Sequence, residues 1–177
     1  GGIFYHNTFI TAVEGENVVN NHFRNNLIVS TRSNMPAMNL ATYTNYTTSD
    51  FNGFRAGRSA PSLVTWRSPP RGVMRDYESE FVPQQFSDLD AYSEATGNDR
   101  NSILIDYDDF RNVTQPDESQ PHLVLPADDL DFRLRRGSAA IDAGDILPGV
   151  NDDFAGDAPD LGALEFGQRQ PIYGPRP

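Results

Sequence analysis

Three short segments near the start of the chain share an apolar, strand-like pattern with asparagine at or beside its centre. They cover residues 4–10, 22–28 and 49–54. Asn7 and Asn25 are 18 residues apart. Asn26 and Asn52 are 26 residues apart, so the average spacing is near 22. This spacing is typical of one coil of a parallel β-helix, in which every turn adds a short strand to each of three sheets.

Asparagine has a physical role in such a coil. At the same corner of successive coils, about 4.8 Å apart, its side chain tolerates left-handed backbone and hydrogen-bonds along the stack. We therefore expect parallel strands over residues 4–10, 22–29 and 51–54, with Asn7 above Asn25. The alternative is a set of unrelated antiparallel strands joined by polar turns.

The rest of the chain has few signals of regular structure. One short helix is expected near residues 87–96, with Ser87 as its N-cap and Gly97 as its end. Seven prolines between residues 60 and 127 predict long loops with short strands. The sequence therefore predicts a single domain or fragment. Its parts are coils (1–59), proline-rich loops with the helix (60–127) and a closing segment (128–177).

Charge and composition exclude several functions. The net charge is −11, but residues 1–75 hold seven arginines against three acidic residues. Overall acidity argues against a nucleic-acid partner, whereas a locally basic face suits an acidic polymer such as a uronate glycan. The imbalance is equally compatible with general acidity alone. The sequence contains no cysteine or lysine, which excludes thiolate sites and a lysine base, and no apolar run approaches a membrane span.

The end of the chain carries the most specific motif. It consists of Ser138–Gly144, Asn151–Gly156, Ala158–Glu165 and Tyr173–Arg176. This segment resembles the C-terminal closing segment of bacterial right-handed parallel β-helix proteins of the pectate-lyase-like superfamily. Ala139 stands for the usual proline and Leu164 for the usual tyrosine. The resemblance implies an all-β, right-handed parallel β-helix and a secreted, periplasmic or cell-surface location. It also implies lyase or glycoside hydrolase activity on polysaccharides.

The expected register places His6, Arg24 and Asp50 in one outward column, with neighbours about 4.8 Å apart. In a β-elimination on a uronate, a cation stabilises the carboxylate while a base takes the α-proton. Arg24 could be that cation, and His6 or Tyr46 could act on the proton. The alternative is a polar column that only keeps the sheet soluble.

A second group suits a carbohydrate cleft, because aromatic faces stack on sugar rings and arginine binds acidic groups. Its members are Tyr43, Arg55, Arg58 and Trp66, with Tyr46 and Arg67 nearby. In the alternative, Trp66 anchors its loop in the core and the arginines pair with acidic residues.

Two sets of carboxylates are further candidates. A glycoside hydrolase needs two carboxyl groups across a cleft. The sequence offers Asp76, Glu78, Asp106, Asp108 and Asp109 for them. The acidic cluster with Asp152, Asp153 and Asp157 could bind calcium, or its members could cap turns through their own backbone.

These observations favour the C-terminal portion of a secreted lyase that acts on an acidic glycan. A glycoside hydrolase of the same fold and a noncatalytic surface or adhesion β-helix stay open. A coil cannot bury its own interior, and only about three coils are visible. We therefore expect earlier coils either upstream of Gly1 or in a separate chain.

Overall fold

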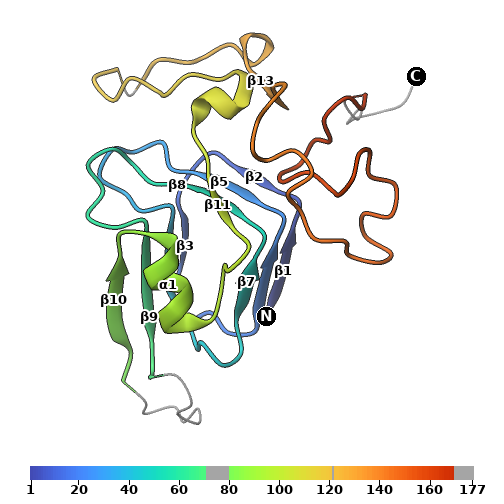
Figure 1. Ribbon diagram of the computed structural model, residues 1–177. Coiled ribbons are helices and arrows are strands. Elements are labelled where there is room, and N and C mark those ends of the chain that lie inside the picture. Colours follow the sequence, from blue (N-terminus) through green and yellow to red (C-terminus); the bar gives the residue numbers. More distant parts are fainter. Residues whose placement is uncertain (71–79, 121, 170–177) are drawn as a thin grey trace.

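The computed structural model describes residues 1–70, 80–120 and 122–169, and this part of the chain is mostly β (Figure 1). The strands follow one another in layers of three. The first layer is β1 (Gly2–Tyr5), β2 (Thr8–Phe9) and β3 (Val13–Gly15). The second is β4 (Asn21–Arg24), β5 (Leu27–Val29) and β6 (Met38–Ala41). The third is β7 (Thr48–Asp50), β8 (Gly53–Arg55) and β9 (Val64–Ser68).

Each strand of one layer pairs in parallel with the corresponding strand of the next. The expected parallel pairing of the three asparagine-containing segments is therefore confirmed. The three strands of each layer lie in different sheets, which have the orders β1-β4-β7, β2-β5-β8-β11 and β3-β6-β9-β10. β10 (Val82–Phe86) is antiparallel to β9, and β11 (Ile103–Leu104) is parallel to β8.

The register differs by one residue from the expected one. Tyr5 pairs with Arg24, and Arg24 with Asp50, so Asn7 lies over Asn26 and not over Asn25. The reason lies at the bend after each strand of the β1-β4-β7 sheet. There His6, Asn25 and Phe51 have φ of 51°, 58° and 53°. Each bend thus uses one left-handed residue before its asparagine.

One core fills the space between the three sheets. It contains Phe23, Ile28, Met38, Phe54 and Trp66, all fully or almost fully buried. A second core lies on the opposite face of the β2-β5-β8 sheet, where Leu27 and Val29 contact residues of the later chain. Those residues include Ile105, Tyr107, Phe110, Leu134 and Leu161. The sheet is therefore covered on both faces, and the closing segment packs against its outer one.

The short helix α1 (Leu89–Thr96) lies close to its expected position and ends at Gly97, which has a φ of 79°. Its N-cap is Asp88 instead of Ser87, because the Asp88 carboxylate accepts a hydrogen bond from the Ala91 N–H. Tyr92 on this helix packs against Trp66 and Phe86, with ring centroids 5.6 and 5.5 Å away. α1 therefore covers the third-layer end of the core (Figure 1).

The remaining chain is irregular. It contains the 3-10 turns η1 (Tyr107–Asp109) and η2 (Ala127–Asp129), and the antiparallel pair β12 (Phe110–Asn112) and β13 (Asp131–Leu134). Within the described ranges, no helix is long and apolar enough to cross a membrane. Tyr173–Arg176, part of the closing motif, lie outside the described residues.

Candidate functional site

The outer face of the β1-β4-β7 sheet brings together an arginine, a histidine and a tyrosine. Successive side chains of a strand alternate between the two faces. Phe4 and Phe23 stack inside the core with ring centroids 4.7 Å apart. Their neighbours therefore point outward. The outer face consists of Ile3, Tyr5, His22, Arg24, Thr48 and Asp50.

Arg24 is half-buried and has no carboxylate partner among the described residues. Its Nη1 donates to the Phe23 carbonyl oxygen at 2.8 Å. The neighbouring Asp50 carboxylate accepts instead from the Asn101 backbone N–H (2.8 Å) and from its Nδ2 (2.9 Å). The remaining guanidinium N–H groups of Arg24 can therefore donate hydrogen bonds to an external anion.

His22 lies two residues before Arg24 on the same strand and the same face. Its Nδ1 is 2.9 Å from the Thr48 hydroxyl, and its Nε2 forms no hydrogen bond with the described residues. His22 was not among the residues predicted from the sequence. The alternation of side chains along a strand was sufficient to place it on the same face as Arg24, whatever the register.

A cavity of about 240 Å³ adjoins this face at Tyr5. It is lined by Tyr5, His6, Asn151, Asp153, Glu165 and Gln168, among others. Burial raises the pKa of Glu165, and its Oε2 is buried without a hydrogen-bond partner among the described residues. Tyr5 thus connects the Arg24 face to a pocket that contains a carboxyl group.

His6 has a structural role. Its Nε2 accepts hydrogen bonds from the side-chain amides of Asn25 (3.0 Å) and Asn151 (2.8 Å). Burial lowers the His6 pKa, while the backbone carbonyls of Gly162 and Asp160 oppose that shift. His6 is thus a neutral clamp between the first layer and the closing segment, and its basic nitrogen is occupied. The expected column of His6, Arg24 and Asp50 is wrong in its first member, because Tyr5 takes that place.

Acid is expected to weaken the His6 clamp. The pKa of folded His6 lies below its ordinary value of 6.5, so the unfolded chain binds the proton first. The stability contributed by neutral His6 is present above pH 6.5 and is lost as the pH falls below it. Denaturant unfolding of the wild-type chain and His6→Asn should show this loss only in the wild type. Asparagine keeps a neutral side chain and tolerates the positive φ. His22→Asn, the control, should retain the wild-type pH response.

Trp66 and Arg55 do not form a binding surface. Trp66 is 0% exposed, and its Nε1–H donates to the Thr44 hydroxyl at 2.9 Å. Arg55 is 7% exposed, pairs with Asp106 at 2.8 Å and lies 4.4 Å from the Tyr107 ring centroid. The prediction that these two side chains bind a glycan is wrong, because Trp66 is packed in the core and Arg55 is buried in an ion pair with Asp106.

The other expected contact residues are dispersed. Tyr43 is buried, with its ring edge-on to Phe81 at 5.1 Å. Arg58 is exposed. Tyr46 is 45% exposed but precedes β7, at the end of the sheet opposite His6. Tyr46 and His6, the two alternatives for the base, therefore lie at opposite ends of this sheet, and Arg24 lies on its outer face.

The carboxylates proposed for a hydrolase are engaged in local structure. Asp106 accepts from Tyr107 N–H and from Arg55, Asp109 accepts from Asp106 N–H, and Asp108 pairs with Arg135. Asp76 and Glu78 lie outside the described residues. Asp106 and Asp108 line one cavity of about 460 Å³, but each is paired with an arginine, Asp106 with Arg55 and Asp108 with Arg135.

The closing-segment aspartates behave as turn caps. The Asp152 carboxylate accepts from Gly149 N–H at 3.0 and 2.9 Å, and Asp157 donates its own N–H to Asp142. Among residues 1–70, 80–120 and 122–169, no three histidine, aspartate or glutamate side chains form a possible metal site. Asp152, Asp153 and Asp157 are therefore not gathered into such a group within these ranges.

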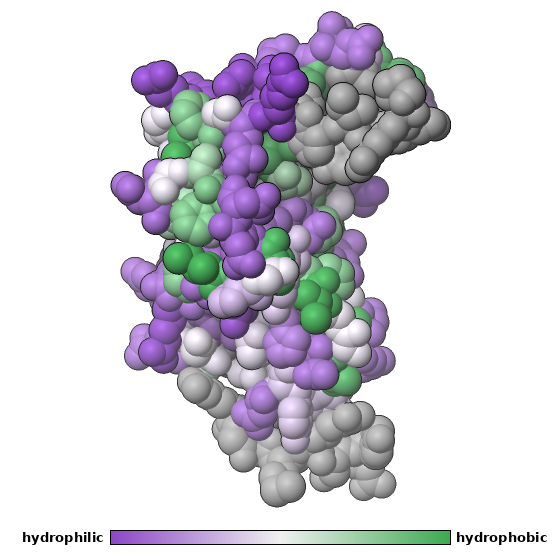
Figure 2. Space-filling model, turned by 90° about the vertical axis from the view of Figure 1, so that its right-hand side faces the viewer, coloured by the Kyte–Doolittle hydropathy of each residue, from purple (hydrophilic) through white to green (hydrophobic). Residues whose placement is uncertain are grey.

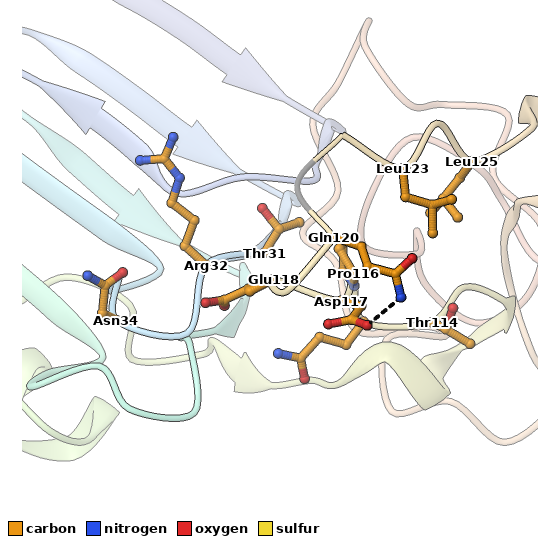
Figure 3. Close-up of a pocket in the computed structure, with 11 residues that line it drawn as sticks. Thr31, Arg32, Asn34, Thr114, Pro116, Asp117, Glu118, Gln120, Leu123 and Leu125 are labelled. Atoms are coloured by element: carbon orange, nitrogen blue, oxygen red, sulfur yellow. Dashed lines mark hydrogen bonds between the residues drawn. The ribbon is translucent and has the colours of Figure 1, made fainter.

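A larger cavity, of about 620 Å³, lies between the loop after β5 and the segment 114–125 (Figure 3). Its acids are already hydrogen-bonded: Glu118 to Ser33, and Asp117 to Ser119 and Gln120. Arg32 is outnumbered by these two acids, so the cavity does not favour an acidic ligand.

Comparisons of this chain with protein-family models, curated proteins and solved structures find no match.

Proposed function

We propose that this chain is the closing part of a right-handed parallel β-helix protein that binds an acidic polysaccharide. Parallel pairing of three successive layers supports the coil architecture. The right-handed sense is supported because crossover connections between parallel strands of one sheet are almost always right-handed. A secreted, periplasmic or cell-surface location belongs to the same proposal, since that is where such polymers are found.

The observation that carries the binding proposal is the unpaired Arg24 on an outer face beside Tyr5 and His22. Guanidinium N–H groups bind carboxylates bidentately, and an aromatic ring beside them suits a sugar ring. An extended sheet face also matches a linear polymer better than a closed pocket does. The cavity next to Tyr5 offers space for one sugar unit at the end of this face.

β-Elimination is the reaction that these groups fit best. Arg24 would neutralise the uronate carboxylate, and this makes the neighbouring C–H more acidic. His22 Nε2 would take that proton as the glycosidic oxygen leaves from the adjacent carbon, so that a C=C bond forms. A hydrolase is less well supported, because the described candidate acids serve local structure.

Arg24→Ala is expected to weaken binding of a polygalacturonate oligomer at least about tenfold, because one charge-assisted bidentate contact contributes about 1.5–3 kcal/mol. Calorimetric titration at low and high salt measures this. Arg136→Ala is the control, because Arg136 is an exposed arginine that lies in the closing segment. Equal affinity of Arg24→Ala and wild type would rule out this face as the binding site.

His22→Ala separates catalysis from binding. A lyase base predicts loss of the ultraviolet-absorbing unsaturated product with little change in affinity. If the wild-type chain instead produced new reducing ends without that absorbance, it would be a hydrolase. Binding without either product would indicate a noncatalytic surface or adhesion protein.

A further inference from the structure

A directional chain of side-chain amides runs through the three layers. The Asn7 N–H and Nδ2 both donate to Asn26 Oδ1, each at 3.0 Å. The Asn26 N–H and Nδ2 donate in the same way to Asn52 Oδ1, at 3.0 and 2.9 Å. The Asn52 Nδ2 donates to the buried Asp99 carboxylate at 3.0 Å. In each of these hydrogen bonds between layers, the acceptor belongs to the next group along the chain of amides, and the Asp99 carboxylate terminates that chain at the third-layer end.

The opposite end of this chain has a free acceptor. Asn7 Oδ1 accepts no hydrogen bond from the described residues, although the same atom of Asn26 and of Asn52 accepts two. In the repeating pattern, the group that would fill this place is the N–H and Nδ2 of another asparagine.

The strands at this end are also incomplete. β1, β2 and β3 are each the outermost strand of a sheet, so all three present an unpaired backbone edge. Their inward side chains Phe4, Phe9 and Val13 are only partly buried. The side chains below them, Phe23, Ile28 and Met38, are 2%, 0% and 0% exposed. The view in Figure 2, from the side on which β1 lies in Figure 1, shows apolar patches among polar residues.

We propose that this end docks one further coil of three parallel strands, continuous with β1 through Gly1. This coil carries an asparagine over Asn7 and apolar side chains over Phe4, Phe9 and Val13. The proposal rests on the coil architecture above but not on glycan binding.

A second copy of the chain does not fit. Docked by the same end, it would bring Asn7 Oδ1 toward an identical acceptor and would place its strands antiparallel. Docked by its other end, it would meet α1, whose Tyr92 already covers the core there.

Covalent continuity needs only a short connection. Gly1 lies against the Asn20 carbonyl oxygen, at the corner where residues 16–20 connect β3 to β4. The next corner connects β6 to β7 through residues 42–47. A preceding coil could therefore join β1 through a connection like these two.

Hydrogen exchange on the intact chain tests the open end. Backbone amides of β1–β3 should exchange at least about tenfold faster than those of β4–β6, because the outer edge lacks a neighbour. Equal protection in the monomer, or protection that appears with dimerisation, would overturn the proposal. No glycan is present, so this result is independent of uronate binding.

A fusion protein tests whether a covalently attached coil occupies the first-layer end. A copy of residues 21–46 is placed before Gly2, in place of Gly1, so that its copied Asn26 falls over Asn7. Exchange in β1–β3 should slow to the level of β4–β6. The same fusion with Asn26→Leu in the copy only should protect less, because it lacks the side-chain amide that donates to Asn7 Oδ1. Unchanged exchange in the fusion, or equal protection by the separate 21–46 peptide, would contradict a covalent coil.

Discussion

Asn52→Leu is expected to lower the free energy of unfolding by about 3–5 kcal/mol, because two or more buried polar groups lose their partners at about 1–3 kcal/mol each. Asn52 is fully buried and is the last amide of the chain, between Asn26 and the Asp99 carboxylate. Leucine has a similar size but cannot accept from the Asn26 N–H and Nδ2, nor donate to Asp99. Denaturant unfolding followed by circular dichroism measures the loss.

The loss should depend on pH. Burial raises the pKa of Asp99, and the hydrogen bond from Asn52 opposes that rise. Without Asn52, the Asp99 pKa rises further, so the ionised carboxylate destabilises the variant as the pH rises through it. Asn52→Leu should therefore be closer to the wild type in acid than at neutral pH.

Asn7→Leu is the matched control. Asn7 belongs to the same chain of amides but is only half-buried at its open end. Its replacement should cost no more than about 1 kcal/mol, because water can reach the groups it leaves. Equal losses at both positions would contradict a buried, directional network.

The sequence predicts the parallel pairing of the strands but not its register. Asn25 and Asn26 are adjacent, so either could lie below Asn7. The layers also have unequal lengths: Gly2 pairs with Asn21, and His22 with Thr48. A fixed period therefore cannot choose between the two asparagines. That choice moves His6 off the candidate face and places Tyr5 beside Arg24 instead.

Contacts between segments that are distant along the chain could not be predicted from the sequence. The His6 clamp depends on Asn151 and on the closing segment, more than 140 residues later. The partner of Arg55 is Asp106, and nothing in a linear pattern joins these two residues. Arg55 was therefore assigned to ligand binding because arginine commonly binds acidic groups. In the fold, however, its partner is Asp106 of the same chain.

The burial of Trp66 could have been predicted from alternation. In β9, Val64, Trp66 and Ser68 are buried, whereas Thr65 and Arg67 between them are half-exposed. A period of two in a strand places Trp66 on the same face as Val64, toward the core. From its residue type alone, Trp66 was equally compatible with stacking on a sugar ring and with burial in the core.

Trp66→Ala should accordingly destabilise the fold by about 3–5 kcal/mol, the usual cost of removing a buried tryptophan. The cavity would open against Tyr92 on α1, so the helix that covers this end of the core should lose protection from hydrogen exchange first. Tyr46→Ala removes an aromatic ring that is 45% exposed and should change stability by no more than about 0.5 kcal/mol.

Trp66→Phe distinguishes packing from binding. Phenylalanine keeps most of the apolar contact with Tyr92 but cannot donate to Thr44, so the cost should fall to about 1–2 kcal/mol. Uronate binding by Trp66→Phe should equal that of the wild type at temperatures where both are folded, because the ring is 0% exposed. A loss of affinity in this variant, with unfolding unchanged, would show that Trp66 reaches the ligand and would contradict its place in the core.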